Sequence, residues 1–201
     1  TPVILTYNEA PNIGRVMKSL QWASRIVVVD SYSHDDTMSI LEGFHNVDVY
    51  QRAFDSHADQ WNYAIKETAI DTDWVLALDS DYVLTNEVVT EISNLIPGNL
   101  NRGYEASFSY CIFGQPLRGT LYPPVTILYR QEGATYFQDG HTQRIKITGD
   151  IGQLREKTLH DDRKPLSSWL QAQDRYMELE ADIISKSSFG ELGINDRVRK
   201  L

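Results

Sequence analysis

The sequence predicts an α/β fold, with a mixed, mainly parallel sheet flanked by helices and one long helix near the C-terminus. The composition is that of a globular protein, because 41% of the 201 residues are hydrophobic and 23% are charged. In the first half, short strands that are apolar on both faces alternate with amphipathic helices, which is typical of a parallel sheet covered on both sides. In the second half strand-like segments continue without helices between them, which indicates a mixed or antiparallel extension of the sheet. The length predicts one domain over residues 1–201.

The first half predicts four strands and four helices in alternation. The strands are short runs rich in Val, Ile and Leu: Val3–Thr6, Arg25–Asp30, Val47–Gln51 and Trp74–Leu78. The helices have apolar residues at helical spacing or polar residues at their starts: Pro11–Ser24, Asp35–Phe44, His57–Ala69 and Thr85–Ile96. Asn8 or Asn12 is the expected cap of the first helix, and Pro97-Gly98 is the expected stop of the fourth.

The second half predicts three strands and one long helix. Glycine and proline separate the expected strands, which are Glu105–Phe113, Thr126–Arg130 and Gln143–Thr148. The helix is expected over Pro165–Lys186, where apolar residues recur on one face: Leu166, Trp169, Leu170, Tyr176, Met177, Leu179, Ile183 and Ile184. We interpret Trp169 and Tyr176 as core residues rather than as a platform for a sugar ring.

Charge and composition argue against several classes of protein. The 28 acidic and 19 basic side chains give a net charge of −9, which works against a nucleic-acid partner. No apolar run approaches the roughly 18 residues that span a membrane. A single cysteine, Cys111, allows neither an intramolecular disulfide nor a cysteine-based zinc site and fits a reducing compartment. The chain opens at Thr1, almost inside a strand, so we expect the sequence to be trimmed or a fragment.

Carboxylates follow three of the four strands expected in the first half. Glu9 follows the first strand, Asp30 ends the second, and Asp79 and Asp81 follow the fourth. In an open parallel sheet ligands bind at this edge, where a carboxylate rim suits a divalent cation or hydrogen bonds to ribose and base N–H groups. Asp79 and Asp81 are two residues apart on an extended segment, so both can reach one site, and hard oxygen donors suit Mg²⁺ or Mn²⁺. The other Asp-x-Asp, Asp71-Thr72-Asp73, precedes its strand and is interpreted as a turn.

Several motifs occur in a characteristic order along the chain. They are TYNEAPNIG, VVVDSYSHDDT, ADQWNYAI, DWVLALDSDYVL, QDGHTQRI and LHDDRKPLSSWLQAQDRYMELEAD. Together they resemble the family-2 glycosyltransferases of the GT-A fold, including a bacterial branch of lipopolysaccharide-core and capsule enzymes. The resemblance covers nearly the whole chain. It departs from the family at Tyr82, where relatives often carry an acid directly after the Asp-x-Asp.

The resemblance implies a role for named residues. The implied nucleotide contacts are Thr6, Tyr7, Glu9, Asp30 and Asp79. The implied metal ligands are Asp79, Asp81 and His160, and the implied diphosphate contacts are Arg163 and Lys164. The implied catalytic base is Asp139, which follows Gln138 where relatives often carry Glu, and Asp161 and Asp162 are rival candidates.

The resemblance also implies an activity. It is that of an inverting glycosyltransferase dependent on Mn²⁺ or Mg²⁺, with a UDP-sugar or, alternatively, a GDP-sugar as donor and a saccharide or glycolipid as acceptor. Residues 1–100 would bind the nucleotide sugar and residues 101–201 the acceptor. The implied location is the cytoplasm, at the inner face of the membrane if the protein associates with it peripherally. Two alternative hypotheses for the function remain: a non-catalytic scaffold that binds sugar nucleotides, and a nucleotidyltransferase.

Overall fold

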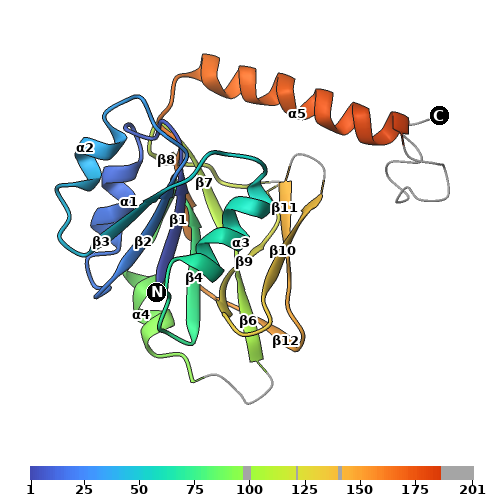
Figure 1. The fold of residues 1–201 in the computed structure, drawn as a ribbon. Coiled ribbons are helices and arrows are strands. Elements are labelled where there is room, and N and C mark those ends of the chain that lie inside the picture. Colours follow the sequence, from blue (N-terminus) through green and yellow to red (C-terminus); the bar gives the residue numbers. More distant parts are fainter. Residues whose placement is uncertain (97–100, 121, 140–141, 187–201) are drawn as a thin grey trace.

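The computed structural model describes residues 1–96, 101–120, 122–139 and 142–186, which form a central sheet with helices on both faces (Figure 1). The helices are α1 (Ile13–Ser19), α2 (Thr37–Leu41), α3 (His57–Glu67), α4 (Asn86–Ser93) and α5 (Leu166–Lys186). The main sheet, in the order β12-β6-β9-β4-β1-β2-β3, contains β1 (Pro2–Thr6), β2 (Ile26–Asp30), β3 (Val47–Gln51), β4 (Trp74–Asp79), β6 (Asn101–Ala106), β9 (Val125–Arg130) and β12 (Asp150–Gln153). A smaller sheet, in the order β5-β13-β7-β8, contains β5 (Tyr82–Val83), β7 (Phe108–Ile112), β8 (Gln115–Pro116) and β13 (Thr158–His160). A hairpin pairs β10 (Thr135–Asp139) with β11 (Thr142–Lys146).

Two apolar cores lie on opposite faces of the main sheet. Helices α1, α2 and α4 cover one face, where Met17 and Val88 pack among strand residues such as Val28. Helix α3 and the β10–β11 hairpin cover the other face, where Trp61 stacks on Tyr136 with ring centroids 5.4 Å apart. Because strands β1, β2 and β4 are covered on both faces, they are apolar almost throughout, which is why the sequence predicts a parallel sheet.

The parallel part of the sheet brings three strand ends to one edge. Strand β1 pairs in parallel with β2 and β4, in a register that places Thr6 beside Asp30 and Leu5 beside Asp79. Strand β3 continues the parallel set, whereas β9 is antiparallel to both β4 and β6. The mainly parallel α/β fold and its mixed extension are therefore confirmed.

The smaller sheet carries a late segment of the chain to the end of β4. Strand β13 lies between β5 and β7, so His160 pairs with Tyr82 on one side and Tyr110 on the other. Since β5 follows Asp79-Ser80-Asp81 directly, this pairing places His160 next to the two acids.

Some predicted elements are wrong in extent. The single strand expected over Glu105–Phe113 is two strands, β6 and β7, because the chain passes from the main sheet to the smaller sheet at Ser107. The first helix begins at Ile13 and ends at Ser19, so it is shorter than the expected Pro11–Ser24. Pairing creates five strands that the sequence did not predict: β5, β8, β10, β12 and β13. The expected stop at Pro97-Gly98 lies outside the described residues.

The long helix was predicted correctly to within one residue, but its apolar residues are not in the core. Figure 1 shows α5 extending beyond the layers of the domain. Its exposed large hydrophobic side chains, within the described residues, are Leu166, Trp169, Leu170, Met177 and Leu179. In the described part of the chain, no helix has the length and apolar character needed to cross a membrane.

Candidate active site at the carboxyl edge of the sheet

The loops after β1 and β2 are joined by side-chain hydrogen bonds. The Asn8 N–H donates to Ser33 Oγ at 2.9 Å, and Asn8 Oδ1 accepts from the His34 N–H at 2.8 Å. Both loops turn through a residue in the left-handed region, Asn8 at φ 54° and Tyr32 at φ 61°. The joined loops lie along the carboxyl edge of the sheet, and Tyr7 in the first of them is 53% exposed.

Asp30 is fully buried at the end of β2 and its carboxylate already has partners. It accepts from the Ser33 N–H at 3.0 Å, from the Ser33 hydroxyl at 2.5 Å and from Gln51 Nε2 at 3.4 Å. In this conformation Asp30 therefore orders the β2 loop. By contrast, the buried hydroxyl of its neighbour Thr6 has no hydrogen-bond partner among the described residues.

Asp79, Asp81 and His160 gather at the end of β4. His160 Nε2 lies 3.3 Å from Asp81 Oδ2. Burial, reinforced by the negative charge of Asp81, raises the pKa of Asp79 to about 6. Burial alone would lower the pKa of His160, but the hydrogen bond to Asp81 and the charges of both acids raise it above its ordinary value.

Aromatic rings enclose the imidazole of His160. The ring centroids of Tyr110, Tyr122 and Tyr82 lie 4.6, 4.8 and 5.1 Å from that of His160. The hydroxyls of Tyr82 and Tyr122 are 2.6 Å apart, so Tyr122 is joined to the residue that follows Asp81. These contacts fix the imidazole with Nε2 directed at Asp81.

The structure allows a test of whether a metal ion fits this cluster. As the side chains are placed within the described ranges, no three His, Cys, Asp or Glu residues are grouped around a metal position, Asp79, Asp81 and His160 included. Their donor chemistry does fit a metal, since carboxylate oxygens suit Mn²⁺ or Mg²⁺ and imidazole is a ligand of first-row transition metals. His160 Nδ1 is buried and finds no hydrogen-bond partner in the described part of the chain, so Nε2 is the ring nitrogen that faces polar groups. The mutual repulsion of Asp79 and Asp81 is also what a bound cation would relieve.

The two predicted diphosphate contacts have partners of their own. Arg163 forms two hydrogen bonds of 2.8 Å to the carboxylate of Asp161 and packs against Gly114. Lys164 Nζ lies 2.6 Å from Glu9 Oε1. Burial raises the pKa of Glu9, an effect that the charge of Lys164 only partly offsets. The segment 161–164 thus lies against the loop after β1, with its positive charges already paired.

Asp139 is the most exposed of the three candidate bases. It ends β10 in an ion pair with Arg144, and its side chain is 48% exposed. In Figure 1 this end of the hairpin lies toward α5. Strands β1 and β4 run toward the end of the molecule where the Asp139 end of the hairpin lies (Figure 1).

The rival acids are held more firmly. The Asp161 carboxylate accepts from Arg15, Arg163 and the Gly114 N–H, at 2.7 to 3.0 Å. Burial opposes ionisation of Asp161, but its bonds to Arg163 and Arg15 give it a net pKa below the ordinary value, which disfavours it as a base. Asp162 Oδ1 accepts from Asn12 Nδ2 at 2.8 Å and from the Lys164 N–H at 2.9 Å.

The sequence matches the family described as glycosyl transferase family 2 over residues 1–152. The chain belongs to this family. An uncharacterized glycosyltransferase of Rickettsia felis is 32% identical over 104 residues, which are 51% of this chain and 36% of that protein. One of Rickettsia bellii is 36% identical over 90 residues, which are 44% of this chain and 30% of that protein. The chain thus spans about a third of the length of the curated relatives it matches.

Solved structures share the architecture at low sequence identity. Residues 1–349 of S. aureus TarS are 16% identical with a TM-score of 0.59, over 99% of this chain and 67% of that fragment. The mannosyltransferase PcManGT from Pyrobaculum calidifontis, in complex with GDP-Man and Mn²⁺, is 13% identical with a TM-score of 0.63, over 93% of this chain and 64% of that one. Glucosyl-3-phosphoglycerate synthase from Mycobacterium tuberculosis, in complex with Mn²⁺, UDP and glucosyl-3-phosphoglycerate, is 16% identical with a TM-score of 0.56, over 88% of this chain and 76% of that one. These likenesses show the fold and confirm the GT-A architecture that the family motifs predict.

The structure of this family member also reveals residues that the sequence analysis missed. Asn12 and Arg15 bind the segment 161–164 from the start of α1, and Tyr122 contacts both Tyr82 and His160. Asn12 drew attention only as a helix cap, and at that position its side chain makes no cap hydrogen bond. Contacts between residues 150 positions apart leave no local pattern, so no signal in the sequence identifies them.

Proposed function

We propose that this chain is the catalytic domain of a metal-dependent, inverting glycosyltransferase that uses a nucleotide-sugar donor. The observation that carries the proposal is the cluster at the end of β4, where His160 Nε2 lies 3.3 Å from Asp81 beside Asp79. Membership of glycosyl transferase family 2 supports the reaction class. The edge of the sheet supports the location, because parallel sheets bind ligands where their strands end.

The donor binds along the ends of β1, β2 and β4. Thr6, Tyr7, Glu9, Asp30 and Asp79 are the nucleotide contacts we propose, and they all stand at these strand ends. Structural neighbours support a nucleotide sugar, since TarS has been solved with UDP-GlcNAc and PcManGT with GDP-Man. A UDP-sugar is the donor we favour, and a GDP-sugar is the alternative.

The metal is Mn²⁺ or Mg²⁺, held by Asp79, Asp81 and His160. When bound, such an ion supplies positive charge that stabilises the departing diphosphate. The two neighbours solved with Mn²⁺ support a metal in this fold. Lys164 also stabilises the diphosphate, which competes with Glu9 for the ammonium group of Lys164. Arg163 adds a second positive charge if its guanidinium moves from Asp161 to the diphosphate.

In the transfer step an acceptor hydroxyl oxygen attacks the anomeric carbon as the bond from that carbon to the diphosphate oxygen breaks. Attack opposite the leaving group inverts the anomeric configuration. Asp139 accepts the proton of the hydroxyl, because its side chain is exposed enough to reach an acceptor. The rival candidate Asp161 is less suited to this role, because its bonds to Arg163 and Arg15 lower its pKa. The acceptor is a saccharide or a glycolipid bound by residues of the second half.

The biological setting we propose is synthesis of a cell-surface polysaccharide or glycolipid on the cytoplasmic side of the membrane. The support is the resemblance of the QDGHTQRI and LHDDRKP segments to a bacterial branch of the family. Apolar side chains exposed along α5 are compatible with a peripheral contact to the membrane.

The proposal is tested by measuring hydrolysis of a panel of UDP- and GDP-sugars by the purified protein, with and without Mn²⁺. We expect one donor to be hydrolysed in a Mn²⁺-dependent reaction, and Asp81→Asn to abolish that turnover while the protein stays folded. The matched control is Asp73→Asn. Asp73 is the last acid of the motif Asp71-Thr72-Asp73, and its side chain is 84% exposed. Near-wild-type turnover by folded Asp81→Asn protein would overturn the metal assignment. Nucleotide-sugar binding without turnover would favour the scaffold, and transfer of a nucleotidyl group to a sugar phosphate would favour the nucleotidyltransferase.

A further inference from the structure

Asn12 is a fully buried polar side chain in which every hydrogen-bonding group is used. Its Nδ2 group donates to Glu9 Oε2 and to Asp162 Oδ1, both at 2.8 Å. Its Oδ1 accepts from Arg15 Nη2 and from the Arg163 backbone N–H, also at 2.8 Å. An amide has two donors and two acceptor sites, so these four bonds satisfy it completely.

The partners of Asn12 come from two distant parts of the chain. Glu9 and Arg15 lie on either side of it in the β1–α1 segment, whereas Asp162 and Arg163 lie about 150 residues later. The later segment contains Lys164, whose Nζ bonds to Glu9 Oε1 while Asn12 holds Oε2 of the same carboxylate. Asn12 therefore fixes both the orientation of Glu9 and the position of the backbone that carries Lys164.

We infer that Asn12 is a positioning residue, which sets Glu9 and Lys164 in place to receive a nucleoside diphosphate. The inference rests on the proposed function, because Glu9 and Lys164 are the donor contacts proposed above. Asn12 does not itself touch the donor. It acts through the ion pair between Glu9 and Lys164, which supplies a carboxylate toward the nucleoside and an ammonium toward the diphosphate.

The chemistry at this position requires an amide rather than an acid. Asn12 stands between the carboxylates of Glu9 and Asp162 and donates one N–H to each. Asn12→Asp would keep the acceptor for Arg15 and for the Arg163 N–H but would replace both donated bonds with repulsion between carboxylates. The Asp side chain has nearly the same shape as that of Asn, so the substitution tests the two donated hydrogen bonds and leaves the packing almost unchanged.

The experiment measures dissociation constants for UDP, GDP and their nucleosides by titration calorimetry in the presence of Mn²⁺. For the diphosphate that wild-type protein binds, we expect Asn12→Asp to raise Kd about tenfold or more, as expected when a hydrogen bond to a charged group is lost. The Kd of the matching nucleoside should rise by a smaller factor, because the nucleoside loses only the contact to Glu9, whereas the diphosphate loses that contact and the one to Lys164. Loss of selectivity for the diphosphate distinguishes positioning from general destabilisation.

Three further substitutions separate the positioning role from folding. In a Lys164→Ala background, Asn12→Asp should raise the Kd of the diphosphate by a smaller factor than in the wild-type background, because the contribution through Lys164 is already lost. Asn46→Ala removes a different side chain-to-backbone bond, from Asn46 Nδ2 to the Ala23 carbonyl, and should leave every Kd unchanged. If Asn12→Asp does not fold, Asp162→Ala removes, from a partly exposed position, the acceptor of one Asn12 N–H together with that of the Lys164 N–H, and should shift the Kd of the diphosphate in the same direction.

The outcomes distinguish failure of this inference from failure of the proposed function. If wild-type protein binds neither UDP nor GDP with Mn²⁺, the proposed function fails and the inference fails with it. If wild-type protein binds one of them and folded Asn12→Asp binds it equally well, only the inference is overturned. It is also overturned if diphosphate and nucleoside are weakened by the same factor.

Discussion

The acidic side chains at the end of the sheet differ in how firmly the fold holds them. Asp30 is buried with its carboxylate bonded to Ser33, and Asp161 is bonded to two arginines. Asp139 is half exposed and forms an ion pair with Arg144. A group that must exchange a proton with a substrate needs access to it, whereas a group that orders a loop does not. Residues of one type are thus suited to different tasks by their surroundings.

Asp30→Ala is expected to raise the donor KM more than it lowers kcat, because a contact to the base is made equally in the ground and transition states. It should also lower the melting temperature, since the Ser33 N–H and hydroxyl lose their buried acceptor. Steady-state kinetics and a thermal melt measure the two effects. The comparison variant is Ser33→Ala, which removes the hydroxyl partner but keeps the carboxylate. If Ser33→Ala raises KM by the same factor, Asp30 acts only through the loop.

Asp139→Asn is expected to lower the rate of sugar transfer about 10²- to 10⁴-fold, the usual contribution of a general base. Donor affinity should persist, because the donor contacts we propose in the first half of the chain come from other strands. Rates of transfer and of donor hydrolysis, measured together, check this expectation. Asp162→Asn is the control, and a selective loss of transfer in that variant alone would place the base in the segment 161–164.

At the scale of the elements, two tryptophans show the difference between a helix that builds the core and one that does not. Trp61 of α3 is 2% exposed and stacks on Tyr136, whereas Trp169 of α5 is 45% exposed. The interpretation of Trp169 as a core residue was therefore wrong. Helical spacing of apolar residues shows that a helix has an apolar face but not that the domain provides a partner for it.

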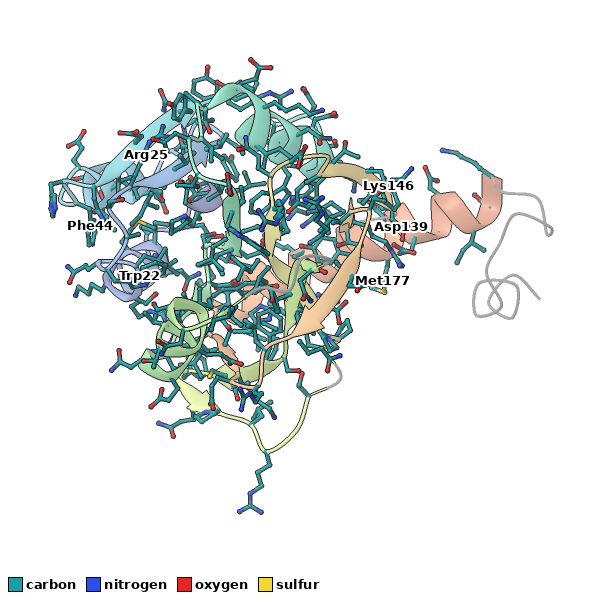
Figure 2. The ribbon with its side chains drawn as sticks, turned by 90° about the horizontal axis from the view of Figure 1, so that it is seen from below. Trp22, Arg25, Phe44, Asp139, Lys146 and Met177 are labelled. Atoms are coloured by element: carbon teal, nitrogen blue, oxygen red, sulfur yellow. The ribbon has the colours of Figure 1, made fainter. Side chains whose placement is uncertain are left out.

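Trp61→Ala should lower the free energy of unfolding by about 3–5 kcal/mol, the usual cost of removing a large buried side chain. Trp169→Ala should cost less than about 1 kcal/mol, as for a surface substitution. Trp22→Ala is the matched control, since Trp22 is 46% exposed and lies on the far side of the molecule from Asp139 (Figure 2). Urea denaturation measures all three. A cost for Trp169→Ala close to that of Trp61→Ala would mean that α5 packs on the domain in solution.

Elements with a strong local pattern could be predicted from the sequence, and elements created by pairing could not. Strand β2 is buried along its whole length, so its run of valines identifies it. Strand β13 has three residues and exists because it fits between β5 and β7. For the site, the strand ends identify Asp79 and Asp81, but the bonds of Asn12 to a segment 150 residues away have no counterpart in local sequence.

At the scale of the whole molecule, the two halves of the chain share one sheet. Strand β9 from the second half pairs with β4 from the first, with Tyr129 beside Val75 and Leu128 beside Leu76. The side chain of Tyr129 is buried in the core beneath α3. The halves assigned to donor and acceptor are therefore connected through the core of the sheet.

A fragment of residues 1–96 is expected not to fold by itself, because removing β9 exposes the edge of the apolar strand β4. The full chain should instead unfold in one cooperative transition. Circular dichroism melts and size-exclusion chromatography of both proteins check this. An independent cooperative melt of the fragment would show that the first half is a folding unit of its own.

The bonds that join Arg15 to Asp161 and Glu9 to Lys164 span 146 and 155 residues, which has a consequence for how the protein matures on the ribosome. At synthesis rates of about 5–20 residues per second, the partner of Arg15 emerges roughly 7 to 30 s after Arg15 itself. Through that interval the early strands can pair, but Glu9 and Arg15 have no counter-charges from the later segment. This edge of the sheet is thus completed only after residues 161–164 have been translated, and a nascent chain that stalls before residue 161 lacks the arrangement that would receive a nucleotide.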